Sequence, residues 1–403
     1  MRDRTKPSEG PAQAEREPCS ARAPREGCAR PARGVEWPYG KIGGVPKVRE
    51  PLTPDGLPPL TGKPGVSYIM PVLNEAEHIT QAITTILSQD YDGEKEVVLA
   101  LGPSTDDTNA IIARMAAADP RIQTVDNPAA ATPIGLNRAI AHTRHPVVIR
   151  VDAHSGLEPD YTRQAIETLQ VTQAANCGGL MRARGKSPFQ KAVARAYMSP
   201  IGLGGPAYHS GDEAGESESA YLGVYRREVF DHLGGFDEDI KRGQDWELNL
   251  RIRSAGGRIW FNPDMEVTYW PRGTWSKIAR QFWATGIWRA ELIRRYGSKN
   301  SLRYFAPPIL VIGMAASVIE ALLQLTGRTK RWPKLVRRFT SLVHVPSFAY
   351  IAGIVAAAGA AKDCGRRERF WFGIILPTMH LCWGAGFLRG LVTGAGTTKD
   401  GSR

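Results

Sequence analysis

Short apolar runs alternate with amphipathic segments in the first half of the chain. The runs have the length of strands buried on both faces and cover residues 66–70, 96–101, 122–125 and 147–151. Between them, Ile79, Ile83 and Ile86 fall at helical spacing, and further helices are expected to begin at 104–108 and at 132–133. Strands that alternate with helices of about ten to fifteen residues predict an α/β fold with a mostly parallel, Rossmann-like sheet flanked by helices.

The last hundred residues have a different pattern, in which basic connectors separate three apolar segments. Each segment approaches the roughly 20 residues that cross a bilayer; they cover residues 305–325, about 343–361, and 370–392. The connectors 327–341 and 362–369 are both rich in Arg and Lys, and the positive-inside rule places both in the cytoplasm. Three simple crossings would place the two connectors on opposite sides of the membrane. The pattern therefore predicts membrane helices but leaves the number of membrane crossings open.

The segment 274–296 joins these two regions and combines tryptophans with basic residues. Trp275, Trp283 and Trp288 occur among residues such as Lys277 and Arg280. A basic amphipathic helix that bears tryptophan is typical of a membrane interface. The alternative is a core helix packed on the α/β domain. Both interpretations can hold at once if one face of the helix packs on the domain and another face lies in the membrane interface.

The N-terminal residues are rich in Pro, Arg, Glu, Ala and Gly and have few large apolar side chains. Such a segment cannot bury enough surface to offset its ordering entropy, which predicts disorder. The expected organisation is a disordered tail (1–62), an α/β domain (63–272), an interfacial helix (273–300), a membrane-associated helical region (301–394) and a polar C-terminal tail (395–403).

A net charge of +12 indicates an anionic partner. No motif typical of nucleic-acid binding is present, so nucleic acid is not expected as a partner. Much of the positive charge lies beside the apolar C-terminal segments, which favours membrane lipids. The five cysteines are scattered, without a C-x-x-C pair, and so predict neither a disulfide framework nor a zinc site.

Two candidate metal ligands follow the apolar run 147–151. Asp152 and His154 come just past the carboxyl end of a predicted buried strand, where α/β folds bind ligands. A carboxylate and an imidazole two residues apart can hold a divalent cation that binds phosphates, Mn²⁺ somewhat better than Mg²⁺. The alternative for His154 is a structural hydrogen bond to a neighbouring loop. A dehydrogenase is not favoured, because Asn74 and Glu75 stand where the first turn of a dinucleotide-binding domain would be Gly-rich.

Six short motifs occur in a fixed order along the chain. They read P-V-L-N-E (71–75), S-T-D-D-T (104–108), R-V-D-A-H (150–154), Y-L-G (221–223), R-R-E-V-F-D-H-L-G-G-F-D-E (226–238) and G-Q-D-W-E-L-N (243–249). Together they resemble the family 2 glycosyltransferases over roughly residues 65–270. The nearest subgroup in this resemblance is that of the membrane-attached enzymes of bacterial exopolysaccharide assembly, of the succinoglycan type. The resemblance implies a GT-A fold and a nucleoside-diphosphate sugar as donor.

The resemblance also implies roles for the residues of the first three motifs. The expected nucleotide-sugar contacts are Pro71, Leu73, Asn74, Glu75, Ser104, Asp106 and Asp152. Asp152 and His154 would hold Mn²⁺ or Mg²⁺, which would neutralise charge on the departing diphosphate. Asp106 can equally be a helix-start residue favoured by the helix dipole. Gly102 stands where the family usually carries an Asp, so one nucleotide contact is missing.

Asp245 is the expected catalytic base. An inverting transfer needs a group that accepts the proton of the attacking hydroxyl, and the family uses the Asp of a similar Glu-Asp pair at a helix start. Gln244 replaces that Glu, and Gln244 and Trp246 are expected on the acceptor side. The helix N-terminus would favour the ionised form of Asp245. The alternative is an ordinary capping Asp.

Together with the apolar C-terminal segments, the resemblance implies a membrane-bound inverting glycosyltransferase of polysaccharide or cell-envelope biosynthesis. It would transfer sugar to a lipid-linked or growing glycan acceptor, with its catalytic domain on the cytoplasmic side of the cell membrane and other polysaccharide-assembly proteins as further partners. The segment 281–285 lacks the Q-x-x-R-W signature of processive synthases, which favours addition of one sugar per event. The alternative is a catalytically idle nucleotide-binding scaffold, which the departures at Gly102, His154 and Gln244 would fit.

Overall fold

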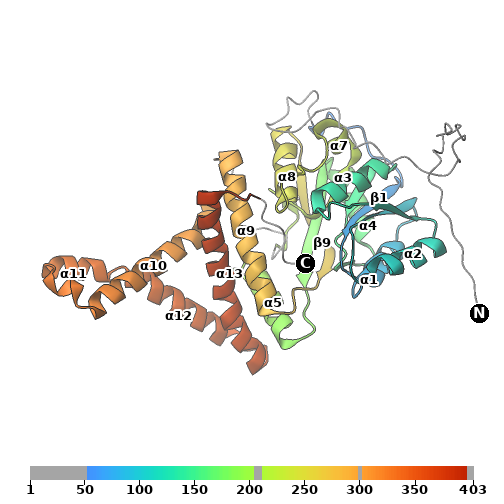
Figure 1. The fold of residues 1–403 in the computed structure, drawn as a ribbon. Coiled ribbons are helices and arrows are strands. Elements are labelled where there is room, and N and C mark those ends of the chain that lie inside the picture. The colour runs from blue at the N-terminus through green and yellow to red at the C-terminus, as the bar shows by residue number, and fades with distance from the viewer. Residues whose placement is uncertain (1–51, 204–210, 298–301, 397–403) are drawn as a thin grey trace, which may run out of the picture. The chain divides into compact units, whose positions relative to one another are not determined.

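A mixed β-sheet of nine strands forms the centre of the part of the chain that precedes residue 270 (Figure 1). The computed structural model describes residues 52–203, 211–297 and 302–396. The strands are β1 (Val66–Val72), β2 (Lys95–Leu101), β3 (Ile122–Asp126), β4 (Val147–Arg150), β5 (Ser155–Leu157), β6 (Asn176–Ala183), β7 (Gly215–Glu216), β8 (Tyr221–Arg226) and β9 (Ile259–Tyr269). Their order in the sheet is β3-β2-β1-β4-β8-β6-β9-β5, and β7 pairs with β9.

Helices flank this sheet and continue beyond it. The helices of the sheet region are α1 (Ile79–Leu87), α2 (Thr108–Ala118), α3 (Thr132–His142), α4 (Tyr161–Thr172), α5 (Pro188–Met198), α7 (Arg227–Leu233) and α8 (Gln244–Ser254). The C-terminal helices are α9 (Trp275–Tyr296), the 3-10 helix η2 (Leu302–Phe305), α10 (Ala306–Leu325), the 3-10 helix η3 (Arg328–Arg331), α11 (Lys334–Ser341), α12 (His344–Ala360) and α13 (Arg366–Thr393).

The first four strands are parallel, as the apolar pattern predicts. β1 pairs in parallel with β2 and β4, and β2 pairs in parallel with β3. All residues of β1 and β4 are buried, because helices cover both faces of this half of the sheet. The carboxyl ends of β1, β2 and β4 therefore meet at one edge.

The other half of the sheet is mixed, which corrects the expectation of a mostly parallel sheet. β8 lies between β4 and β6 and runs antiparallel to both, and β5 and β7 run antiparallel to β9. Only β6 and β9 pair in parallel there. An apolar run indicates a strand but not its direction, which the connections between strands decide.

The expectation of disorder as far as residue 62 is wrong for its last part. Leu52 and Leu57 are buried in the apolar core between the sheet and α8. The backbone N–H of Leu52 donates to the carbonyl of Ala255, at 3.0 Å. Buried leucines and hydrogen bonds, such as that from Arg226 to the Pro58 carbonyl, anchor this segment, although its composition resembles that of the residues before it. The rest of the expected tail, residues 1–51, lies outside the described residues.

A buried ion pair holds α8 in place, the helix whose second residue is the candidate base. The Arg251 guanidinium donates from Nε and Nη2 to the two Glu247 oxygens, at 2.7 and 2.8 Å. It also donates to the carbonyls of Leu233 and Gly235. The Tyr296 hydroxyl of α9 donates to Glu247, at 3.1 Å. Because both charges are buried and fully engaged, they tie α8 to its neighbours.

Glu247→Ala is expected to lower the free energy of unfolding by about 3–5 kcal/mol, because it leaves the Arg251 charge buried without its carboxylate. Denaturant unfolding of the full chain in detergent measures this change. The matched control is Glu167→Ala, which breaks an Arg163–Glu167 pair of the same i,i+4 spacing on the surface of α4. That change is expected to cost less than about 1 kcal/mol, and equal losses in the two variants would contradict the prediction.

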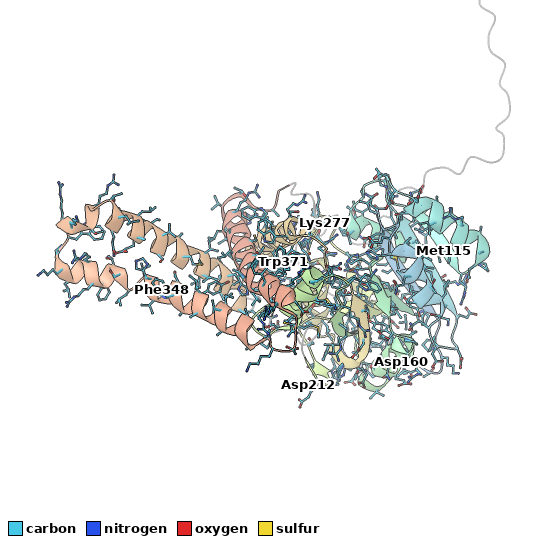
Figure 2. All side chains as sticks on the ribbon, turned by 90° about the horizontal axis from the view of Figure 1, so that it is seen from below. Met115, Asp160, Asp212, Lys277, Phe348 and Trp371 are labelled. Carbon is cyan, nitrogen blue, oxygen red and sulfur yellow. The ribbon has the colours of Figure 1, made fainter. Side chains whose placement is uncertain are left out.

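The three apolar C-terminal segments form helices, as predicted. Within the described ranges, three helices are long and apolar enough to cross a membrane, and they span Leu302–Leu325, Lys334–Ala360 and Arg366–Thr393. α10 and α12 extend away from the sheet toward α11 and expose many apolar side chains, such as Ile309 and Phe348 (Figures 1 and 2). Such surfaces are suited to lipid contact.

α13 differs from α10 and α12 because it packs along α9 and against α5 (Figure 1). The backbones of α9 and α13 approach closely where Gly286 faces Trp383 and Gly386 faces Trp283, so that a larger residue would overlap the opposite backbone. α9 buries Phe282 on this side. α9 is therefore a packed helix on one face, whereas Trp275 on the same helix is 50% exposed.

Candidate active site

Hydrogen bonds fasten together the loops that follow β1 and β2. The Asn74 N–H donates to Ser104 Oγ at 3.1 Å, and Asn74 Oδ1 accepts from the Thr105 N–H at 2.8 Å. The Glu75 N–H donates to Thr108 Oγ1 at 2.8 Å. Asn74 has a φ of 54°, a left-handed conformation that Asn tolerates better than most residues. The motifs 71–75 and 104–108 therefore form one structural unit.

Asp106 is exposed in this unit, and its carboxylate is held by local donors. It accepts hydrogen bonds from the hydroxyl and N–H of Thr108 and from the N–H of Ala76. These bonds, above all the one from the Thr108 hydroxyl, lower the pKa of Asp106. They are the bonds of a residue that organises a helix start, and the nucleotide contact at Asp106 stays a prediction.

The position of Leu73 explains why residue 102 is a Gly where the family usually carries an Asp. Pro71 is buried within β1, and Leu73 follows that strand and lies against Gly102. A Cβ atom at residue 102 would approach Leu73 Cδ1 to 2.9 Å and the Val72 carbonyl to 3.1 Å. The chain has too little room at this position for an Asp unless Leu73 moves.

Glu75 and His154 link the ends of β1 and β4. His154 Nδ1 lies 3.3 Å from Glu75 Oε1, and both side chains are largely buried. The contact with a neighbouring loop that the structural interpretation of His154 requires is therefore present, and the metal-ligand role of His154 stays a prediction. The same bond is what a metal-binding histidine needs, because a carboxylate on one ring nitrogen leaves the other with its lone pair toward a cation.

Arg150 joins the candidate metal ligand to the candidate base. Its Nη2 donates to Asp152 Oδ1 at 3.0 Å, and its Nη1 donates to Asp245 Oδ1. The Arg150 side chain is only 6% exposed. Burial opposes its charge, but the two carboxylates outweigh burial and raise the pKa of Arg150. This role of Arg150 was not predicted from the sequence, although a lone Arg within the apolar run 147–151 is a signal that could have indicated it.

Asp245 is the second residue of α8 and does not cap this helix. Gly243 occupies the N-cap position without a side-chain bond, and the Asp245 carboxylate turns to Arg150. The enclosed position of Asp245 raises the pKa of its carboxyl, and the negative charge of Asp152 adds to this, whereas Arg150 opposes it. The sequence had suggested that the helix N-terminus would keep the pKa of Asp245 low. That expectation is wrong, because the pKa of Asp245 is raised.

Gln244 and Trp246, the neighbours of Asp245, occupy different environments. Gln244 lines the same cavity as Asp245. Trp246 is buried against α9, in a cluster with Ile287 and Trp288, and is absent from the described lining of that cavity. The acceptor-side role of Gln244 and Trp246 stays a prediction.

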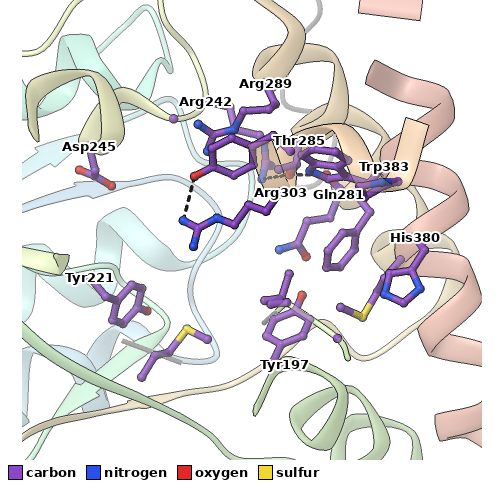
Figure 3. Close-up of a pocket in the computed structure, with 18 of the residues that line it drawn as sticks. Tyr197, Tyr221, Arg242, Asp245, Gln281, Thr285, Arg289, Arg303, His380 and Trp383 are labelled. Carbon is purple, nitrogen blue, oxygen red and sulfur yellow. Dashed lines mark hydrogen bonds between the residues drawn. The ribbon is translucent and has the colours of Figure 1, made fainter. Parts of the chain in front are cut away.

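One cavity of about 910 Å³ connects the candidate catalytic residues to the C-terminal helices (Figure 3). Arg150, Asp152, His154 and Asp245 line it on the side of the sheet. Residues of α9, α10, α12 and α13 line the other side, among them Phe282, Leu310, Tyr350, Met379 and Trp383. The cavity is therefore polar and charged beside the sheet and beside parts of α9 and η2, and more apolar toward α10, α12 and α13.

Comparisons with known proteins decide the family. A sequence profile described as "Glycosyl transferase family 2" matches residues 67–234. The succinoglycan biosynthesis protein ExoA of Rhizobium meliloti (strain 1021) is 31% identical over 332 residues, which cover 80% of this chain and 94% of ExoA. The chain belongs to glycosyltransferase family 2. It is accordingly a glycosyltransferase that uses a nucleotide-sugar donor, and the mixed sheet with its flanking helices is the GT-A fold that the sequence implied.

Other similar proteins share less of the sequence. A transferase of Methanococcus voltae is 26% identical over 263 residues, which cover 63% of this chain and 81% of that protein. Its name is dolichyl N-acetyl-alpha-D-glucosaminyl phosphate 3-beta-D-2,3-diacetamido-2,3-dideoxy-beta-D-glucuronosyltransferase. Among solved structures, the mannosyltransferase PcManGT of Pyrobaculum calidifontis is 21% identical, with a TM-score of 0.49, over 85% of this chain and 90% of that chain.

Proposed function

We propose that this family 2 enzyme is a membrane-bound, metal-dependent, inverting glycosyltransferase of polysaccharide or cell-envelope biosynthesis. It transfers a sugar from a nucleoside-diphosphate donor to a lipid-linked or growing glycan acceptor. The observation that carries this proposal is the continuous cavity from Asp152 and Asp245 to the apolar C-terminal helices. The names of the two relatives, one a succinoglycan biosynthesis protein and the other a transferase named for a dolichyl-linked sugar phosphate, support it.

Asp152 and His154 are the residues that would hold Mn²⁺ or Mg²⁺. In the described ranges, no three His, Cys, Asp or Glu side chains come together as a closed metal site. A cation that also binds a diphosphate needs only one or two protein ligands, because phosphate oxygens and water complete its shell. The Glu75–His154 bond supports this assignment. When bound, the metal would act as a Lewis acid toward the diphosphate.

Asp245 carries the proton transfer in this proposal. The acceptor hydroxyl gives its proton to the Asp245 carboxylate as its oxygen forms a bond to the anomeric carbon. The bond from that carbon to the diphosphate breaks on the opposite face, which inverts the configuration. Arg150 holds Asp245 and Asp152 in one ion-paired group, so that base and donor site keep a constant separation.

The membrane part of the proposal rests on the surfaces of the C-terminal helices. α10 and α12 expose apolar side chains that water solvates poorly, and Trp275 of α9 is suited to the interface. We place the catalytic region, here from residue 52, on the cytoplasmic side, where nucleotide sugars are made. The basic stretch 362–369 covers the connection from α12 and the first residues of α13, and it is suited to that side.

Donor hydrolysis tests the proposed function. Purified full chain in detergent is mixed with a panel of nucleotide sugars and Mn²⁺ or Mg²⁺, and release of nucleoside diphosphate is measured. We expect release from one donor, loss of release with a chelator, and a fall of roughly 100-fold in Asp152→Asn, since the metal supplies several kcal/mol of charge stabilisation.

Asp90→Asn, an exposed change away from the cavity, serves as the control and should leave the release rate unchanged. Release that a chelator does not affect would overturn the metal-dependent mechanism. Tight binding of nucleoside diphosphate without release or transfer, over the donor panel and with lipid-linked glycan acceptors added, would instead support the idle scaffold.

A further inference from the structure

We infer that Arg242, Arg289 and Arg303 form a binding site for the phosphate group of a lipid-linked acceptor. This inference rests on the proposed function and adds to it the substrate class and the residues that would recognise it. The three arginines line the cavity between Asp245 and the apolar helices (Figure 3). They come from three separate places, namely the loop before α8, the helix α9 and the 3-10 helix η2.

Aromatic rings and two hydroxyl groups orient these arginines. The Arg289 Cζ lies 4.0 Å from the ring centre of Tyr304 and 5.1 Å from that of Trp246. Arg242 Nη1 donates to Thr285 Oγ1 at 3.3 Å, and Arg303 Nη2 donates to the Tyr304 hydroxyl at 3.2 Å. Stacked guanidinium groups keep their charge and present a rigid set of donors, which matches the oxygens of a phosphate.

The charges around the cavity favour an anionic ligand. Among its described lining residues, the basic side chains are Arg150, Lys241, Arg242, Arg272, Arg289 and Arg303, and the carboxylates are Asp152 and Asp245. Arg150 binds both of these carboxylates. Glu218, which lies outside the described lining, forms an ion pair with Arg303 at 3.8 Å and leaves the described lining with more basic than acidic side chains. An enclosed region with this excess of cations attracts phosphate.

The position of the arginines favours the acceptor over the donor as the source of this phosphate. The nucleotide-side residues Asn74 and Asp106 lie at the ends of β1 and β2 and are not among the described residues of the cavity lining. Asp245 must touch the acceptor hydroxyl if it is the base. The space beyond Asp245, toward the C-terminal helices, is therefore acceptor space, and Arg242 and Arg289 lie there (Figure 3).

The apolar end of the cavity identifies what the phosphate is attached to. It is lined by Pro307 and Leu310 of α10, Tyr350 of α12, and Met379 and Trp383 of α13. His380 of α13 also lines it, with its Nδ1 2.9 Å from the Tyr350 hydroxyl. A free glycan would leave these apolar groups against water, whereas a long hydrocarbon chain would bury them. The ligand class is thus a long-chain alcohol phosphate or diphosphate that carries the acceptor sugar.

Binding of farnesyl diphosphate to the full chain in detergent tests this site. A chelator is present throughout, so that no divalent cation can recruit the diphosphate. We expect farnesyl diphosphate to bind more tightly than farnesol or inorganic diphosphate. Arg289→Gln and Arg242→Gln should each weaken its binding at least about tenfold, because each removes a charge-assisted phosphate contact.

Arg280→Gln is the matched control, since Arg280 is on the same helix as Arg289 but is exposed. It should bind farnesyl diphosphate as the unaltered chain does. Arg289→Lys keeps the charge without the planar donors and should recover part of the affinity. Equal losses in Arg280→Gln and Arg289→Gln, or equal binding of farnesol and farnesyl diphosphate, would overturn the inference.

Nucleoside diphosphate binding in Mn²⁺ separates the two sources of phosphate. With uridine and guanosine diphosphates as probes, Arg289→Gln and Arg242→Gln should bind as the unaltered chain does. If they lose this binding and keep that of farnesyl diphosphate, the arginines serve the donor and the inference is wrong, while the proposed function stands. If farnesyl diphosphate binds as expected but no donor is ever cleaved, the proposed function fails and the lipid phosphate site remains.

Discussion

Asp245→Asn is expected to lower the rate of sugar transfer by about 10³-fold, because a positioned general base contributes roughly 10²–10⁴ to such a reaction. The amide that replaces the carboxylate cannot accept the proton of the attacking hydroxyl. Its oxygen can still accept the hydrogen bond from Arg150, so the surroundings of residue 245 should change little. The loss should therefore be one of turnover and not of folding or of nucleotide binding.

Three measurements on the Asp245→Asn chain test this expectation. Transfer to a lipid-linked acceptor should fall, whereas the affinity for nucleoside diphosphate and the unfolding temperature should remain near those of the unaltered chain. Asp239→Asn, an exposed change in the loop before α8, is the control and should keep full transfer activity. Transfer within about tenfold of normal in Asp245→Asn would assign the base to another residue.

Arg150→Gln is expected to shift the acid limb of the transfer rate to higher pH. The enclosed site and Asp152 raise the pKa of Asp245, and Arg150 opposes both effects. Removal of Arg150 should therefore raise the pKa of Asp245 further. Because only the deprotonated carboxylate accepts a proton, a larger fraction of the enzyme becomes inactive at each pH along that limb.

A pH–rate profile with saturating donor and metal measures this shift. The same variant leaves two enclosed carboxylates without their cation, which should also lower the free energy of unfolding by about 3 kcal/mol at neutral pH. Arg150→Lys keeps the positive charge and should restore much of the acid limb, although it cannot bridge both carboxylates as well. An unchanged acid limb in Arg150→Gln would show that Asp245 does not govern it.

The local sequence was sufficient for the first four strands, the helices between them and the three apolar C-terminal helices. Apolar runs and helical spacing report burial within a few residues, so they predict elements well. The sequence also indicated which polar residues would lie at the carboxyl ends of the parallel strands. Asn74, Glu75 and Asp152 follow predicted parallel strands, and the ends of such strands meet at one edge.

Tertiary structure decided what depends on partners far apart in the chain. Arg150 binds Asp245, which lies 95 residues later, and no local pattern relates the two. The direction of β8 and the anchoring of Leu52 likewise follow from the elements beside them.

The cavity is the clearest case of such dependence on distant partners. The sequence placed the candidate catalytic residues and the apolar C-terminal helices in separate regions, whereas close packing of α13 on α9 brings them to a single cavity. The sequence by itself therefore determined the family and the chemical groups. Only the tertiary structure decided how those groups meet, because enclosure and charge pairing are properties of contacts between distant segments.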